Sequence, residues 1–394
     1  MKRSGSGENS LAGEAWVCSA VTGRSLGRVA LAEAEDVFEA LRHARSAARG
    51  WAGALGETRR SAAGRLVAEI DRRRVEIARL LAEEVGVPIT PLVTSRSVER
   101  SDARRGAHGV SGRVVAWNDP MAGTADLILP ALLAGQACVL VVAPEIALSG
   151  SVLADAVHAA GLPAGLVAVL PGGPAAAETL LAAGVDAGAR WGEPERAAAS
   201  VLLTPDVDLG PFLTALPGDS LAGNGQYPRD RARILVPRGR FAEIVEAVTE
   251  VSAALRVGDP RDPGVQIGPV IDDWNLEALE AAIACAWRAG ARVTLGGARH
   301  RGWEDGCFLE PTVVAGADPL SPAVHPPVPG PLLALIPYEG EQRDAKRMAR
   351  RAGLRIDAAW GANGLEALGG RGARGAEFGA GLAIETAVLA ARSS

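Results

Sequence analysis

The chain has 394 residues, 48% of them hydrophobic and 22% charged, so it can bury a substantial core and is long enough for two or three domains. Its formal net charge of -5 gives no long-range attraction for nucleic acid or for an anionic membrane surface. Four widely spaced cysteines without a CxxC pair, and a polar start at residues 1–8, lead us to expect a reducing cytoplasm.

The first half of the chain reads as helices and buried strands in alternation. Residues 35–51 and 57–84 carry apolar positions at helical spacing and predict two amphipathic helices. Residues 127–143 are apolar enough to raise the question of a membrane span, but Pro130 and the Gly135-Gln136 pair interrupt them. They predict a buried helix followed by a buried strand at 138–142, and a helix at 149–160 and a strand at 166–170 follow.

A second α/β unit follows a Gly/Ala/Arg-rich interval at 172–199. Strands are predicted at 201–203, 234–236, 292–295, 312–314 and 332–336, and helices at 241–255, 276–288 and 341–351. Residues 361–381 are so rich in glycine that they are expected to be mostly loop.

Several segments resemble the aldehyde dehydrogenase superfamily, in the family's order and over most of the chain. The most specific are the VGDP and QIGP pair within residues 256–271 and the EPTV run within 308–314, whereas NGQ at 224–226 alone would be weak. The remaining segments are residues 20–29, 116–120, 130–140, 161–173 and 330–338.

The resemblance implies an α/β fold with a doubly wound cofactor-type domain and an α/β catalytic-type domain. We place the dinucleotide-binding-type domain at 1–199, the catalytic-type domain at 200–360 and a glycine-rich C-terminal return segment at 361–394. The chain is a shortened and divergent member. A reduced oligomerisation arm at about 104–118 is expected to change or weaken assembly, because this arm supplies edge strands to a neighbouring subunit in the family.

In the family a cysteine thiolate attacks the aldehyde, hydride passes to a nicotinamide cofactor, and a glutamate activates the water that releases the acid. The nucleophile position, two residues after the Gln of NGQ, is Pro228, and no cysteine lies between Cys138 and Cys285. Proline also removes the backbone N–H that the family uses as an oxyanion donor. The resemblance therefore implies that no catalytic nucleophile is present.

The other catalytic groups of the family are also incomplete. Asn118, next to Trp117, corresponds to the oxyanion-hole asparagine, although an Asn in this segment can equally form a turn or cap. Glu193 and Glu195 lie near the position of the water-activating glutamate, but two carboxylates beside Arg196 are more typical of a solvated surface cluster.

The cofactor contacts of the family are replaced as well. Its ribose-binding lysine corresponds to Val141 or Val142, and its ribose-binding glutamate to Pro327. Its phosphate-proximal Phe-Thr-Gly-Ser turn has no counterpart, and Gly172-Gly173 is interpreted as a plain turn. No cofactor is therefore expected, whereas the family uses NAD or NADP.

Other catalytic groups are not evident. Cys138 and Cys307 fit core thiols. Ser220, Tyr227 and Asp230 lie near the former nucleophile position without a base positioned by sequence. No metal site is expected, because the five histidines lack ligand spacing. They are His43, His108, His158, His300 and His325.

Two functions remain open at this point. The first is a pseudoenzyme of the superfamily with a structural, partner-binding or regulatory role, whose partner is a second copy or an active paralogue, with neither nucleic acid nor membrane involved. The alternative is an NAD(P)-dependent aldehyde oxidoreductase of altered or weak activity. A decaying gene product without a selected role is a third alternative.

Overall fold

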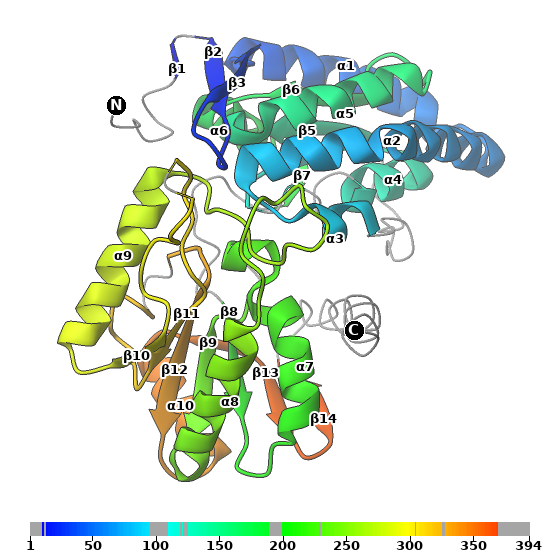
Figure 1. Ribbon diagram of the computed structural model, residues 1–394. Helices are drawn as coiled ribbons and strands as arrows, with labels where there is room; N and C mark the ends of the chain where they lie inside the picture. Colours follow the sequence, from blue (N-terminus) through cyan, green and yellow to red (C-terminus); the bar gives the residue numbers. More distant parts are fainter. Residues whose placement is uncertain are drawn as a thin grey trace, which may run out of the picture. The chain divides into compact units, whose positions relative to one another are not determined.

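The computed structural model describes residues 10–11, 13–94, 109–118, 120, 125–188, 199–227, 230–303, 305–324 and 328–368. Met1–Glu193 and Pro194–Ser394 form two compact units, each with its own sheet (Figure 1). Within the described residues, no helix is both long enough and apolar enough to cross a bilayer.

The first unit is built on a four-stranded parallel sheet. Its order is β6 (Val167–Pro171), β5 (Ala137–Val142), β4 (Val110–Val115) and β7 (Asp186–Gly188). In chain order, β5 is added next to β4 and β6 next to β5, all toward one edge of the sheet. β7 is then added on the opposite side of β4. This is one half of a doubly wound dinucleotide-type sheet.

Helices cover this sheet because parallel strands need crossovers. α1 (Ala34–Ala52) packs with α6 (Pro174–Ala182), and α2 (Gly56–Val85) packs against α4 (Ala125–Ala134) and α5 (Ala147–Ala159). A short helix α3 (Ile89–Thr94) follows α2. Before these helices in the chain, β1 (Ser10–Leu11), β2 (Glu14–Cys18) and β3 (Ser25–Ala30) form a small antiparallel sheet.

The second unit contains a seven-stranded sheet (Figure 1). Its order is β10 (Arg292–Leu295), β11 (Thr312–Ala315), β12 (Leu332–Tyr338), β9 (Arg233–Pro237), β8 (Ala199–Leu203), β13 (Arg355–Gly361) and β14 (Gly364–Ala367). The five central strands are parallel, and both edge strands are antiparallel to their neighbours.

Alternate residues of the central strands form two cores. Leu202 and Leu235 belong to the core that includes α9 (Asp273–Arg288) and α10 (Gln342–Arg351). Val201 and Ile234 belong to the core that includes α7 (Leu209–Ser220) and α8 (Phe241–Ala253). Both faces of the sheet are therefore buried, which explains why its strands read as continuous apolar runs.

The α/β fold class expected from sequence is confirmed, and every predicted helix and strand of 35–160 and 201–351 has a counterpart within a few residues. One feature was misread. Residues 110–115 form β4 in the interior of the parallel sheet, so this part of the supposed arm remnant belongs to the core. The interval 172–199, for which no element was predicted, contains α6 and β7, and an alanine-rich helix begins there at Pro174.

The glycine-rich end contains one short strand that was not predicted. β13 reaches Gly361, and Gly364–Ala367 forms β14, which pairs with it in a hairpin. Ladder hydrogen bonds come from the backbone, so glycines within a short hairpin do not prevent pairing. The rest of the C-terminal return segment, from residue 369, lies outside the described residues, as do residues 104–108 of the arm remnant.

Candidate functional site

The NGQ segment lies in a short 3-10 turn, Ala222–Gly225, between α7 and β9. Asn224 has a left-handed backbone with φ 65°, which asparagine tolerates better than other non-glycine residues. Its fully buried amide donates to the Pro269 carbonyl at 2.9 Å and accepts from the Gly268 N–H at 2.7 Å. The Asn224 side chain therefore clamps the QIGP segment to the turn.

The Gln226 side chain makes a further hydrogen bond to the same segment. Its Oε1 accepts from the Ile271 N–H at 3.0 Å, and the side chain is 2% exposed. Gly225 takes φ 68°, and its carbonyl accepts from the Gly330 N–H at 2.9 Å. A Cβ at Gly225 would lie 2.2 Å from the Gly330 carbonyl oxygen, so only glycine fits. Segments that suggested the family from sequence are thus in direct contact.

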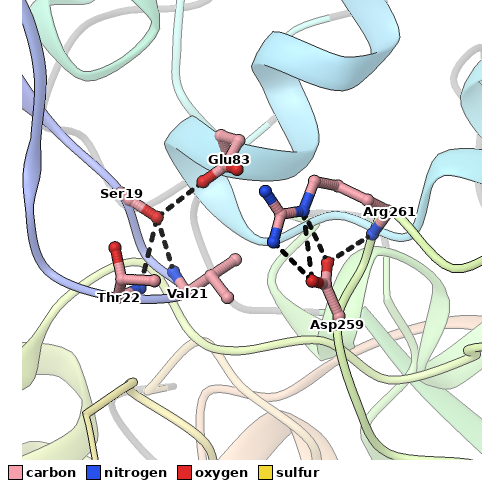
Figure 2. A network of polar contacts seen from close by, with 6 residues as sticks. All are labelled: Ser19, Val21, Thr22, Glu83, Asp259 and Arg261. Carbon is pink, nitrogen blue, oxygen red and sulfur yellow. Dashed lines mark hydrogen bonds and ion pairs between the residues drawn. The ribbon is translucent and has the colours of Figure 1, made fainter.

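The VGDP and QIGP segments are themselves held together as one loop. Gly258 N–H donates to the Ile267 carbonyl at 3.0 Å, and Val257 bridges to Ile267. Asp259 receives the backbone N–H of Arg261 at 2.9 Å and the Nε of its guanidinium at 2.8 Å, as the right-hand part of Figure 2 shows. The side-chain hydrogen bond from Arg261 lowers the pKa of Asp259. Hydrogen bonds within this loop therefore fix the shape of the surface that the NGQ turn contacts.

The polar residues beside the former nucleophile position support the backbone. Ser220 Oγ donates to the Arg231 carbonyl at 3.0 Å, and Asp230 accepts from the Tyr227 N–H at 2.9 Å. The Tyr227 ring covers Gly223, where an added Cβ would meet it at 2.5 Å. Pro228 lies outside the described residues, so whether a cleft opens around it stays untested.

The described cysteines of this unit lie in two different settings. Cys307 is 1% exposed and its thiol donates to Asp273 Oδ1 at 3.5 Å. Cys285 is half-buried on α9 and accepts from the Arg288 guanidinium at 3.6 Å. In the other unit, burial raises the pKa of Cys138 to about 12, which makes its thiol inert at neutral pH.

Asn118 follows the carboxyl end of β4 in a turn and is half-buried. In open α/β sheets ligands bind outside the carboxyl ends of the strands where the strand order reverses, here between β4 and β7. Asn118 therefore lies at the end of the sheet where a ligand is expected. Its interpretation as a turn residue agrees with its backbone, and its role as an oxyanion donor remains a prediction.

Val141 and Val142 are the last residues of β5, and both side chains are buried. Beyond them, the N-terminus of α5 is occupied from within the protein. Glu84 of α2 accepts the N–H groups of Leu148 at 2.8 Å and Ser149 at 3.2 Å. Burial raises the pKa of Glu84 to about 7. Sequence reasoning missed this residue, although its spacing from Leu81 puts it on the apolar face of α2.

The neighbouring Glu83 has a different task. Its carboxylate accepts from the Ser19 hydroxyl at 2.7 Å, and Ser19 Oγ in turn accepts the N–H groups of Val21 and Thr22, both at 3.2 Å (Figure 2). These contacts fix the turn between β2 and β3 to α2. Adjacent glutamates thus organise two different backbone turns of the first unit.

A cavity of about 40 Å³ lies between α2 and α5, close to the carboxyl ends of β4 and β5. Among its lining residues are Leu81, Val115, Val142 and Leu153, and Ser149 contributes polarity. Ligand sites usually measure roughly 300–1,000 Å³, so this cavity is too small and too apolar for a nucleotide.

Comparison with known proteins agrees with these features. The aldehyde dehydrogenase family model matches residues 8–98, 91–187 and 197–357. The chain belongs to the aldehyde dehydrogenase family. It is 30% identical to a geranial dehydrogenase of Castellaniella defragrans over 82% of this chain and 78% of that protein, and 28% identical to a vanillin dehydrogenase of Amycolatopsis over 87% and 79%.

Solved structures show the same fold. A Mycobacterium tuberculosis aldehyde dehydrogenase complexed with NAD+ superposes with a TM-score of 0.76 at 29% identity, covering 89% of this chain and 83% of that one. A second aldehyde dehydrogenase, from Pseudomonas syringae, in complex with NAD+ and octanal, gives a TM-score of 0.74 at 24% identity, over 88% and 81%.

Nicotinamide dinucleotides are the cofactors of this family, and the described residues of the first unit fit one poorly. Val141 and Val142 offer neither charge nor hydrogen bond, and the α5 N-terminus already holds the Glu84 carboxyl group. Pro327 and the Glu193/Glu195 pair lie outside the described residues, so those predictions stay open. No cluster of potential metal ligands occurs among the residues that the structure describes.

Proposed function

We propose that this chain is a family member that lacks aldehyde oxidation and acts as a pseudoenzyme with a structural, partner-binding or regulatory role. The proposal rests on the hydrogen bonds that the side chains of the NGQ turn make. Asn224 and Gln226 direct their amides into loop backbone, while the following segment reads Tyr227-Pro228 in place of a cysteine. The scaffold around the reaction centre is kept without the group that would react.

The remaining thiols do not substitute for that nucleophile. Cys307 and Cys285 are 79 and 57 residues further along the chain than Pro228, and their sulfurs contact Asp273 and Arg288, respectively. Cys307 is 1% exposed, and a fully buried structural thiol is out of reach of a substrate. This supports inactivity in the first catalytic step.

The alternative is an NAD(P)-dependent aldehyde oxidoreductase of altered or weak activity. It is favoured by one observation, the position of Asn118 at the carboxyl end of β4. The family membership also favours it, because relatives such as the geranial and vanillin dehydrogenases are named for aldehyde substrates.

A rate assay separates the two. Purified protein is given a panel of aliphatic, terpenoid and aromatic aldehydes with NAD or NADP, and formation of the reduced cofactor is followed by absorbance. The pseudoenzyme proposal expects no rate above that of protein-free controls. A rate that Asn118→Ala abolishes would establish the alternative.

Ligand binding is measured separately from turnover. A thermal-shift titration with NAD and NADP up to millimolar concentration is expected to leave Tm unchanged, because a ligand that binds only the folded state raises Tm. A saturable shift would show that nucleotide binding survives.

For partners we propose a second copy or an active paralogue of this family, in a reducing cytoplasm. The four cysteines form no disulfide, which supports that compartment. Mass measurement in solution, alone and mixed with a catalytically active paralogue, tests the assembly.

A further inference from the structure

The guanidinium of Arg233 is buried without an acidic partner. Arg233 begins β9 and is 3% exposed. Its Nε donates to the Val324 carbonyl at 2.6 Å, while its Nη1 has no hydrogen-bond partner. Among the described residues, no carboxylate lies within ion-pair distance of it. An uncompensated buried charge is among the most costly features that a folded protein can contain.

Loss of the proton does not remove this cost. Burial lowers the pKa of Arg233 to about 10, so the guanidinium remains charged at neutral pH. The backbone carbonyl of Val324 satisfies one N–H but carries no net charge to balance the cation. A counter-charge must therefore come from outside the described residues.

Two further unpartnered donors lie on the same side of the sheet. Ser200 of β8 is opposite Arg233 in the parallel register, so both side chains project from the same face. Ser200 is fully buried and its hydroxyl has no partner. The face is the one that carries Leu202 and Leu235, which share a core with Ala323 and Val324.

The third donor comes from the turn that Arg233 contacts. Ser321 is 6% exposed, its carbonyl accepts the Val324 N–H at 2.8 Å, and its hydroxyl is without a partner. Arg233 and Ser200 thus lie side by side at the amino-terminal ends of β8 and β9, and Ser321 belongs to the turn whose Val324 carbonyl Arg233 contacts, all in the second unit. Unsatisfied buried polar groups are rare in folded proteins, so three that share one neighbourhood call for a common ligand.

We propose that Arg233, Ser200 and Ser321 form a binding site for one small monovalent anion, of which chloride is the representative. A single guanidinium balances a single negative charge, whereas a phosphate or sulfate dianion would leave excess charge buried. Water would satisfy the hydroxyls but not the cation. The anion would connect the turn at 321–324 to β8 and β9, the strands that carry Ser200 and Arg233.

The test is a thermal-melt titration of the full chain at fixed ionic strength, with chloride replacing gluconate. Saturable stabilisation with one binding midpoint is expected, and sulfate is expected to give no such midpoint. Equal melting temperatures in chloride, sulfate and gluconate would overturn the proposal. Because all three salts screen exposed charges, a general ionic-strength effect cannot mimic the expected result.

Single substitutions test whether the midpoint of the chloride titration reports binding at this site. Ser200→Ala, which removes one donor, is expected to move it about fivefold to tenfold to higher chloride concentration. Ser252→Ala is the matched control, since Ser252 is another buried serine with an unpartnered hydroxyl, on α8, and it should leave the midpoint unchanged. Arg233→Gln should abolish the chloride effect. If Arg233→Gln does not fold, Ser200→Ala decides, and an unchanged midpoint there would refute the site.

Discussion

Asn224 shows how a residue that marks a catalytic motif can serve the fold. Its amide holds Gly268 and Pro269, and its backbone occupies a conformation that few side chains tolerate. The motif therefore persists for a mechanical reason that does not require a reaction.

Replacing Asn224 tests how much its side-chain hydrogen bonds stabilise the fold. Asn224→Gly keeps the left-handed backbone but removes both hydrogen bonds and leaves two buried backbone groups unpaired, so a loss of roughly 2–4 kcal/mol in unfolding free energy is expected. Chemical denaturation measures it. Asn118→Ala, at a half-buried turn position, serves as control with an expected loss of under about 1 kcal/mol. Equal losses in the two variants would contradict the clamp.

Glu84 gives the protein a dependence of stability on pH. Burial raises its pKa from 4.5 to about 7, so the folded state binds this proton more tightly than the unfolded state. The stability that it contributes is complete below pH 4.5 and declines as pH rises to 7, by roughly 3 kcal/mol in total.

Glu84→Gln is the matched variant, because its amide oxygen can still accept the N–H groups of Leu148 and Ser149 without ionising. Unfolding free energies between pH 4.5 and 8 should decline less steeply for Glu84→Gln than for the native chain. Parallel curves would show that another group is responsible.

At the scale of elements, the second unit is held by loops that lie directly against one another. The Asn224 and Gln226 side chains bond the NGQ turn to the 256–271 loop, and a backbone hydrogen bond joins Gly225 to Gly330, which lies just before β12. Gly225 lies against Gly330 with no room for a side chain. Short strands of a parallel sheet gain precise ends in this way.

Gly225→Ala is expected to separate these loops. Its Cβ would clash with the Gly330 carbonyl in addition to the strain of a positive φ, so destabilisation of about 3 kcal/mol or more is expected. Gly290→Ala isolates the strain, since Gly290 has φ 95° but nothing within 4 Å of an added Cβ, and about 1–2 kcal/mol is expected there. Thermal melts of both variants compare the two effects, and equal shifts would rule out the clash.

At the scale of the whole molecule, the departures from family chemistry occur in both units. The resemblance puts Pro228 at the nucleophile position in one unit, and Val141 or Val142 at a cofactor-contact position in the other. The loss of activity that we propose would therefore have causes in both units.

Pro228→Cys is accordingly expected to restore no aldehyde oxidation above background with NAD or NADP, measured by cofactor absorbance. A thiol titration confirms that the introduced cysteine is accessible. Recovered turnover would show that the cofactor contacts are intact and that the deficit lies in one residue.

The sequence alone determined the order of most helices and strands and the family, and it placed a proline at position 228 after the NGQ motif. These follow from local periodicity and from motifs a few residues long, such as NGQ and QIGP. It did not place residues 110–115 inside the sheet, because arm and core strands share the same composition.

Only the tertiary structure showed that Asn224 binds Gly268, that Glu84 fills the end of α5, and that Ser200 lies opposite Arg233. The partners of these three contacts are separated by 44, 64 and 33 residues of chain. No local pattern specifies which buried polar groups meet over such distances, since strand register and helix docking decide it.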